Sequence, residues 1–177
     1  MNILSRRVGS LNFMRRLPVT LVALALLLVP MWAQAQGMSM LPAADQATIR
    51  NYNLNDDVFN RLIAVTKEAR LEGVAQQQQP PDPAKIHTLD DLAAQAVSGD
   101  PRIGVLIKKY GFTPREFLLA NIALMNAAMV EQSKTQPELA SPIDQSKVNQ
   151  ANVTFFETHQ PQIHALMDSP DNSHPQQ

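Results

Sequence analysis

Residues 117–130 read FLLANIALMNAAMV, and this stretch decides the fold of the chain. Its apolar side chains cover nearly every side of a helix, and only Asn121 and Asn126 interrupt them. A helix that is apolar on all sides either spans a membrane or forms the centre of a helical domain. The stretch is too short to cross a bilayer, which takes about 20 apolar residues. We therefore predict a central helix over about residues 114–133, with other helices packed around it.

The start of this central helix carries the strongest local signal outside the N-terminal leader. Thr113 suits the N-cap, and Pro114 suits the first helical position, where a missing N–H costs nothing. Glu116 stands where the acidic partner of a capping box belongs. The sequence TPRE therefore predicts that a helix begins at residue 114.

Further helices are expected on both sides of the central one. Asn55, Thr88, Asp100 and Asn149 are N-cap residues at the start of stretches with helical apolar spacing, and Pro161 should kink or restart the last of them. The predicted ranges are 55–72, 89–98, 101–110 and 149–168. No strand-like alternation exceeds four residues. We predict an all-α fold, an irregular bundle of four or five helices within residues 55–168.

The remaining segments are polar or rich in proline. Residues 36–54 are predicted to form a loose arm with one turn around residues 43–50. Residues 74–87 (VAQQQQPPDPAKIH) predict an exposed connection, because glutamine and proline favour extended conformations. A second polar connection is expected at 135–146, and residues 169–177 predict a disordered tail.

The first 35 residues have the composition of a cleavable secretory signal. Two arginine pairs precede an apolar run at residues 17–32, and Ala33 and Ala35 are the small residues that a signal peptidase reads. The run is shorter than the roughly 20 residues of a retained membrane anchor. We expect cleavage between Ala35 and Gln36 and export to a bacterial periplasm or the exterior. The general secretory route is preferred, because neither arginine pair begins a twin-arginine pattern.

Loss of this leader would leave an acidic chain without cysteine. Four of the 15 Lys and Arg lie in residues 1–35 and none of the 16 Asp and Glu does, so residues 36–177 have a net charge of −5. Binding to nucleic acid needs clustered cations, so we expect no nucleic-acid partner. The helix pair at 103–128 imitates a DNA-reading helix-turn-helix, but its second helix is apolar where a DNA reader is basic and polar. Absence of cysteine excludes disulfides and thiolate metal sites.

Asn121 and Asn126 are the candidates for a polar site. A buried amide must find hydrogen-bond partners or cost roughly 1–3 kcal/mol. Five residues place the two about 140° apart around a helix, so they are not direct neighbours. Either they bond to loop backbone near the polar connections, or they line a polar pocket between helices to which Arg115, Arg102 or Lys108 adds a positive charge.

A metal or haem carrier is a lesser alternative. Thioether ligands for copper could come from Met125, Met129 and Met167 in the core, or from Met38 and Met40 near the mature N-terminus. His159 and His164 are five residues apart, whereas ligands on one helix prefer four. Methionine in a helix is more often core filling, so we predict no cofactor and no metal.

Two short segments resemble a pattern found in small exported bacterial helical proteins with no assigned activity. They are YGFTPREF at residues 110–117, with the apolar helix that follows, and NQANVTF at 149–155. They consist of caps, a corner and core residues. The resemblance therefore implies an all-α fold and brings no catalytic residue.

Motifs of catalysis are missing from the sequence. There is no G-x-S-x-G and no S-x-x-K. We therefore expect a non-enzymatic binding or interaction module whose partner is a protein or a small ligand, without membrane attachment after signal removal. The alternative is a small helical enzyme or ligand-binding protein with a polar pocket formed by Arg115, Asn121 and Asn126.

Overall fold

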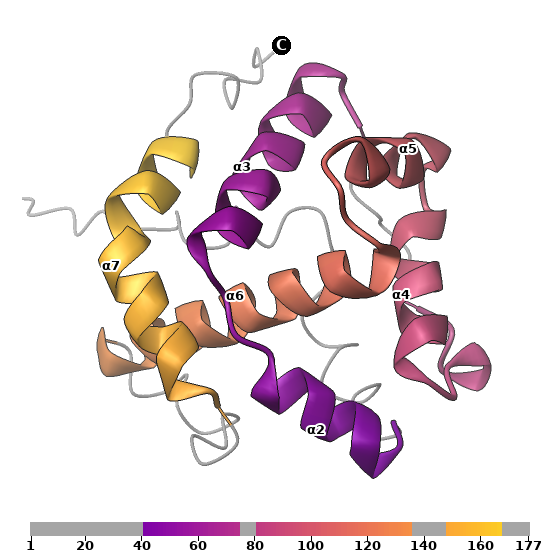
Figure 1. Cartoon of the computed structure of the whole chain (residues 1–177), viewed down its shortest axis with the longest axis horizontal. Coiled ribbons are helices and arrows are strands. Elements are labelled where there is room, and N and C mark those ends of the chain that lie inside the picture. Colours follow the sequence, from indigo (N-terminus) through magenta and orange to yellow (C-terminus); the bar gives the residue numbers. More distant parts are fainter. Residues whose placement is uncertain (1–40, 75–80, 136–147, 168–177) are drawn as a thin grey trace, which may run out of the picture.

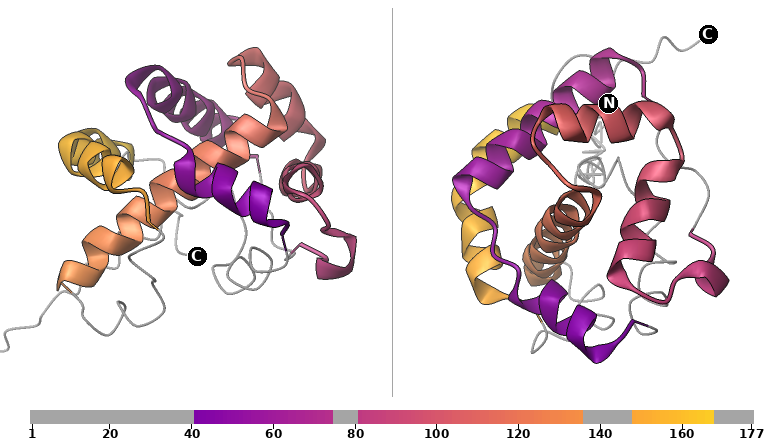
Figure 2. Two further views of the ribbon diagram at one scale, coloured as in Figure 1. Left: turned by 60° about the horizontal axis from the view of Figure 1, so that its bottom comes forward. Right: turned by 45° about the vertical axis from the view of Figure 1, so that its right-hand side comes forward.

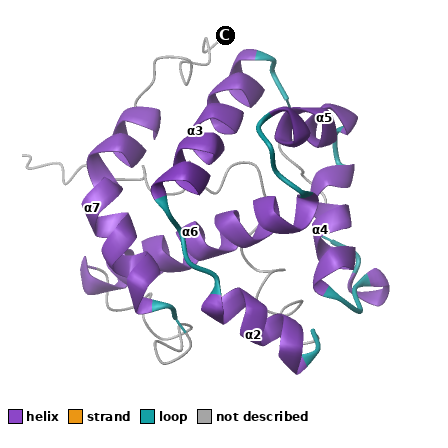
Figure 3. Ribbon diagram, in the orientation of Figure 1, coloured by secondary structure: helices purple, strands orange, loops and turns teal. Residues whose placement is uncertain are grey.

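The computed structural model describes residues 41–74, 81–135 and 148–167 (Figure 1). These residues form helices joined by loops, without a strand among them, so the predicted all-α class is confirmed (Figure 3). The helices are α2 (Ala43–Asn51), α3 (Asp56–Leu71), α4 (Leu89–Ser98), α5 (Pro101–Lys109), α6 (Pro114–Thr135) and α7 (Gln150–Met167), with a short 3₁₀ turn at Pro83–Lys85.

Helix α6 lies at the centre of the molecule, as the apolar stretch predicted. It packs against α2, α3, α4, α5 and α7, and the second view in Figure 2 shows these five helices arranged as a ring around it. All sides of α6 are covered near its start, because four consecutive residues are buried there: Phe117, Leu118, Leu119 and Ala120. None of the helices in the described ranges has the length and apolarity that a membrane span requires.

The predicted caps begin the helices. The side chains of Asn55, Thr88, Asp100 and Asn149 each accept a hydrogen bond from a backbone N–H in the first turn of α3, α4, α5 and α7. Thr113 does the same for α6, through the Glu116 N–H at 3.1 Å. Gly111 ends α5 with a φ of 75°, a left-handed conformation that glycine adopts without strain.

The N-terminal arm differs from its prediction. Residues 43–51 form the nine-residue helix α2 instead of a loose arm with one turn. Leu41, Ile49 and Leu54 are buried in the common core. These three positions do not share a helical spacing, so the apolar pattern gave no sign of a packed helix.

The glutamine- and proline-rich connection also enters the core at its two ends. Val74 and Ile86 are buried, and Asp82 caps the turn at Pro83–Lys85 through the Ala84 N–H. Residues 75–80, most of the second connection and the predicted tail lie outside the described residues.

Helix α7 runs through Pro161 as one continuous helix, so of the predicted kink or restart the restart does not occur. Pro161 is exposed on its outer face. Val153, Phe156 and Ile163 face inward and join the apolar core.

Candidate functional site

Arg115 joins three helices at the start of α6. Its guanidinium binds Asp45 of α2 at 3.1 Å and Asp90 of α4 at 2.9 Å. The pKa of Arg115 is raised by its hydrogen bond to Asp90 and, to a smaller extent, by the one to Asp45. The other carboxylate oxygen of Asp45 accepts from the Leu89 N–H at 3.0 Å. The charge of Arg115 is therefore engaged in holding α2 and α4 to the central helix.

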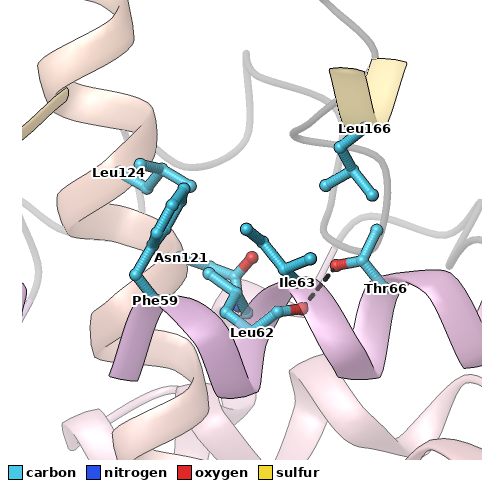
Figure 4. A pocket seen from close by; sticks show the side chains of 7 residues that line it. All are labelled: Phe59, Leu62, Ile63, Thr66, Asn121, Leu124 and Leu166. Atoms are coloured by element: carbon cyan, nitrogen blue, oxygen red, sulfur yellow. Dashed lines mark hydrogen bonds between the residues drawn. The ribbon is translucent and has the colours of Figure 1, made fainter. Parts of the chain in front are cut away.

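Asn121 lines a small cavity between α3, α6 and α7 (Figure 4). Its amide donates to the Phe117 carbonyl, one turn earlier in its own helix, at 2.8 Å. The cavity is lined by Phe59, Leu62, Ile63, Thr66, Asn121, Leu124 and Leu166. Its volume of about 10 Å³ accommodates about one water molecule, whereas sites for drug-sized ligands measure roughly 300–1,000 Å³.

The three residues of the predicted polar pocket are not gathered in this cavity. Arg115 and Asn126 are absent from its lining, and Asn126 is half-buried on another side of α6. Arg102 binds Asp100 and the Glu72 carbonyl, and Lys108 is exposed in the last turn of α5. Asn121 matches neither interpretation fully: it bonds to the backbone of its own helix instead of a loop, and the described residues that line the cavity with it include no cation.

An asparagine anchor on α7, which the sequence analysis did not identify, joins it to the connection between α2 and α3. Asn152, only 3% exposed, accepts from the Leu54 N–H and donates to the Tyr52 carbonyl, both at 2.8 Å. Asn149 donates to the same carbonyl at 3.1 Å and to the Asn53 side chain at 2.9 Å. The only signal in the sequence was two asparagines three residues apart at the start of a helix.

A second polar cluster surrounds Arg61 of α3. Its guanidinium binds Asp57 at 2.9 Å and Glu116 of α6 at 2.8 Å, donates to the Gly111 carbonyl at 3.2 Å, and lies 4.3 Å from the centre of the Phe112 ring. The hydrogen bond to Glu116 raises the pKa of Arg61. This pairing uses Glu116 to fasten α6 to α3, so its carboxylate is not presented as a free base.

Tyr52 lies beside this cluster with its hydroxyl oxygen out of contact with solvent. Burial, and then the nearby negative charge of Glu116, raises its pKa to about 12. A phenol that keeps its proton to such a high pH is poorly suited to act as a general base at neutral pH.

Potential metal ligands are scattered. Within the described ranges, no group of three or more His, Cys, Asp and Glu residues is close enough to hold a metal ion. Met125 and Met129 are half-buried on α6, and His164 is exposed. Met38, Met40 and the side chain of Met167 lie outside the described part.

Two large apolar side chains are exposed among the residues that the structure describes. Leu71 of α3 and Val105 of α5 are 76% and 73% exposed. Single exposed apolar residues are ordinary on soluble proteins. They do not by themselves define a docking surface.

No family model matches the chain, and no curated protein or solved structure matches it either. The structure shows an all-α protein in which polar side chains fasten the helices to one another. The resemblance to small exported helical proteins stays a prediction.

Proposed function

We propose that this protein is an exported, non-enzymatic interaction module that binds another protein in the periplasm or outside the cell. One observation carries the proposal. The charged residues that could have formed a catalytic or ligand site, above all Arg115 and Arg61, are paired with carboxylates of neighbouring helices. Turning either guanidinium toward a substrate would break contacts that join α6 to its neighbouring helices.

The size of the cavity beside Asn121 weighs against a small-ligand site at that position. A volume of about 10 Å³ beside Asn121 is far below the space that a metabolite needs. A helical enzyme or ligand carrier would need the helices around Asn121 to separate, at the expense of contacts made by Phe59 and Leu124. A protein partner can instead bind the outer surface without such a change.

Export is supported by the leader alone, and it has a direct test. The full-length chain with a C-terminal tag is produced in a bacterium, and the mass of the recovered protein is measured. We expect the periplasmic form to begin at Gln36. Ala35→Arg should leave the leader attached, while Gln34→Arg, between the two small residues of the cleavage site, should be processed normally. An intact N-terminus on protein from the cytosol would show that the leader is not a signal.

The interaction is tested with the protein recovered from that fraction. Partners are captured by chemical crosslinking, produced separately and titrated against the tagged protein by calorimetry, with an unrelated acidic helical protein as the control. We expect saturable binding to one protein at a defined ratio. Stabilisation by a small molecule, with chemical-shift changes centred on Asn121, would instead favour the ligand-binding alternative.

A further inference from the structure

His159 lies where α7 meets the start of α3, and two aromatic rings hold its imidazole in place. The ring stacks on Phe155 with centres 3.9 Å apart and planes 16° apart. The Phe59 ring of α3 makes a T-shaped contact with the imidazole, with centres 5.0 Å apart and planes 70° apart. Only 18% of the His159 side chain is exposed. The orientation of both ring nitrogens is therefore set by packing.

Both ring nitrogens of His159 face oxygen atoms that can only accept a hydrogen bond. Nδ1 lies 2.8 Å from the Phe155 carbonyl oxygen, and Nε2 lies 3.0 Å from a carboxylate oxygen of Asp56. A neutral imidazole has one N–H and can satisfy one of these acceptors, whereas an imidazolium donates to both. The arrangement therefore matches the protonated ring, and stacking on Phe155 favours the cation further.

Asp56 is the ionic partner of the His159 ring, because the other charged groups nearby are paired elsewhere or lie on another side of α7. Asp57, the next residue of α3, turns to Arg61 instead. On the α6 side, Lys134 binds Glu131 and Glu157. Glu157 precedes His159 by two residues and so lies on nearly the opposite side of α7.

We propose that His159 is a pH-sensitive clasp that fastens α7 to the first turn of α3 when its ring is protonated. As the pH rises, the ring loses one proton and keeps the N–H that donates to the Phe155 carbonyl. The lone pair of Nε2 then faces the Asp56 carboxylate, and this contact turns from attractive to repulsive. The clasp is therefore present while the ring is charged and is lost when the ring is neutral.

Release of the clasp loosens α7 without freeing it. Asn152 still holds its N-terminal turn, and Arg70 donates to the Leu166 carbonyl near its other end. The affected part is the middle of the helix, around His159. This inference does not depend on the proposed partner or on export, because it concerns a contact within the described fold.

The first test compares folding equilibrium constants of the full chain and of two variants, measured by urea unfolding at about pH 5.5 and about pH 8. Asp56→Asn removes the partner of the ring, and Asp57→Asn is the matched control one residue along the same exposed turn. The ratio of wild type to Asp56→Asn should be about two- to fivefold larger at the acidic pH, as expected for an exposed ion pair. The ratio for Asp57→Asn should not change, because Arg61 stays charged. Equal ratios at both pH values for Asp56→Asn would overturn the proposal, as would an equal change in the control.

The second test is spectroscopic and needs no variant. Nitrogen NMR of the His159 ring should find both nitrogens protonated at about pH 5.5. At about pH 8 the proton should remain on Nδ1, because that nitrogen faces the Phe155 carbonyl. A neutral ring with its proton on Nε2 would contradict the geometry on which the clasp rests.

Discussion

Replacement of Asn152 by alanine tests the asparagine anchor between α7 and the connection from α2 to α3. The change removes two hydrogen bonds of 2.8 Å from a site that is 3% exposed. The Tyr52 carbonyl keeps the hydrogen bond from Asn149 at 3.1 Å. The buried Leu54 N–H loses the partner that Asn152 supplies.

The expected loss of stability follows from these two contacts. A buried N–H without its partner costs about 1–3 kcal/mol, and a lost hydrogen bond whose acceptor keeps another donor costs about 0.5–1.5 kcal/mol. Asn152→Ala should therefore lower the free energy of unfolding by about 2–4 kcal/mol. Small domains have about 5–15 kcal/mol in total, so the variant should still fold.

The assay is urea unfolding followed by far-ultraviolet circular dichroism, which reports on the helices directly. With a denaturant slope of about 1.5 kcal/mol/M, the midpoint should fall by about 1.3–2.7 M. The control is Gln150→Ala in the same first turn of α7, where the side chain is exposed, and its change should stay within about 0.5 kcal/mol. An Asn152→Ala midpoint equal to that of the control would refute the reasoning.

Asn152→Asp distinguishes the contribution of the hydrogen bonds to stability from that of side-chain packing, because the two side chains have nearly the same shape. One carboxylate oxygen can still accept from the Leu54 N–H, but the other faces the Tyr52 carbonyl and has no proton to donate. Protonation of the carboxyl restores a donor there, so folding raises its pKa. The variant should therefore be closer to wild type at about pH 4 than at about pH 7, since a group with a raised pKa loses stability as the pH rises.

Three further predictions concern the core, a cap and the tyrosines. Phe117→Ala should lower the free energy of unfolding by about 3–5 kcal/mol, because the ring is fully buried. Thermal unfolding should find the control Val105→Ala, at an exposed position, within about 0.5 kcal/mol of wild type. Similar losses for both variants would contradict the central role of α6. Thr88→Ala should cost about 1 kcal/mol by removing the capping box of α4, and an unchanged urea midpoint would count against it. In a Tyr110→Phe variant, tyrosinate absorbance should report Tyr52 alone and rise near pH 12. An unfolded tyrosine ionises near pH 10. The contribution of Tyr52 to stability should therefore be complete below about pH 10 and be lost as the pH rises toward 12. Ionisation of Tyr52 near pH 10 would show that its hydroxyl is solvated.

Helix starts could be predicted from the sequence because caps act over a few residues. Asn55, Thr88, Asp100, Thr113 and Asn149 each bond to a backbone N–H within the next three residues. The apolar stretch of α6 likewise predicted its central position, since a helix that is apolar on all sides must be covered on all sides.

Helix α2 could not be predicted because its stability comes from distant residues. Asp45 accepts from the Leu89 N–H, 44 residues away, and binds Arg115, 70 residues away. A nine-residue helix is marginal in isolation. Its local sequence therefore resembles that of a loose arm.

In the candidate site, too, polar residues could be predicted from the sequence but their partners could not. The sequence identified Arg115 and Asn121 as polar groups within an apolar helix, but it could not tell which carboxylates or carbonyls they would meet. Asn152 stood in a recognisable pattern, yet its partners Tyr52 and Leu54 lie 100 and 98 residues away. The volume beside Asn121 depends on how α3 and α7 pack against α6.

By itself, then, the sequence determined the helical class, the helix starts and the helix at the centre, because caps and apolar faces are local properties of the chain. Only the tertiary structure decided that the predicted polar pocket is divided among separate helix contacts, and that His159 meets Asp56 and Asn152 meets Leu54. These outcomes depend on side chains far apart in sequence reaching hydrogen-bond distance, and the packing of the helices alone sets that distance.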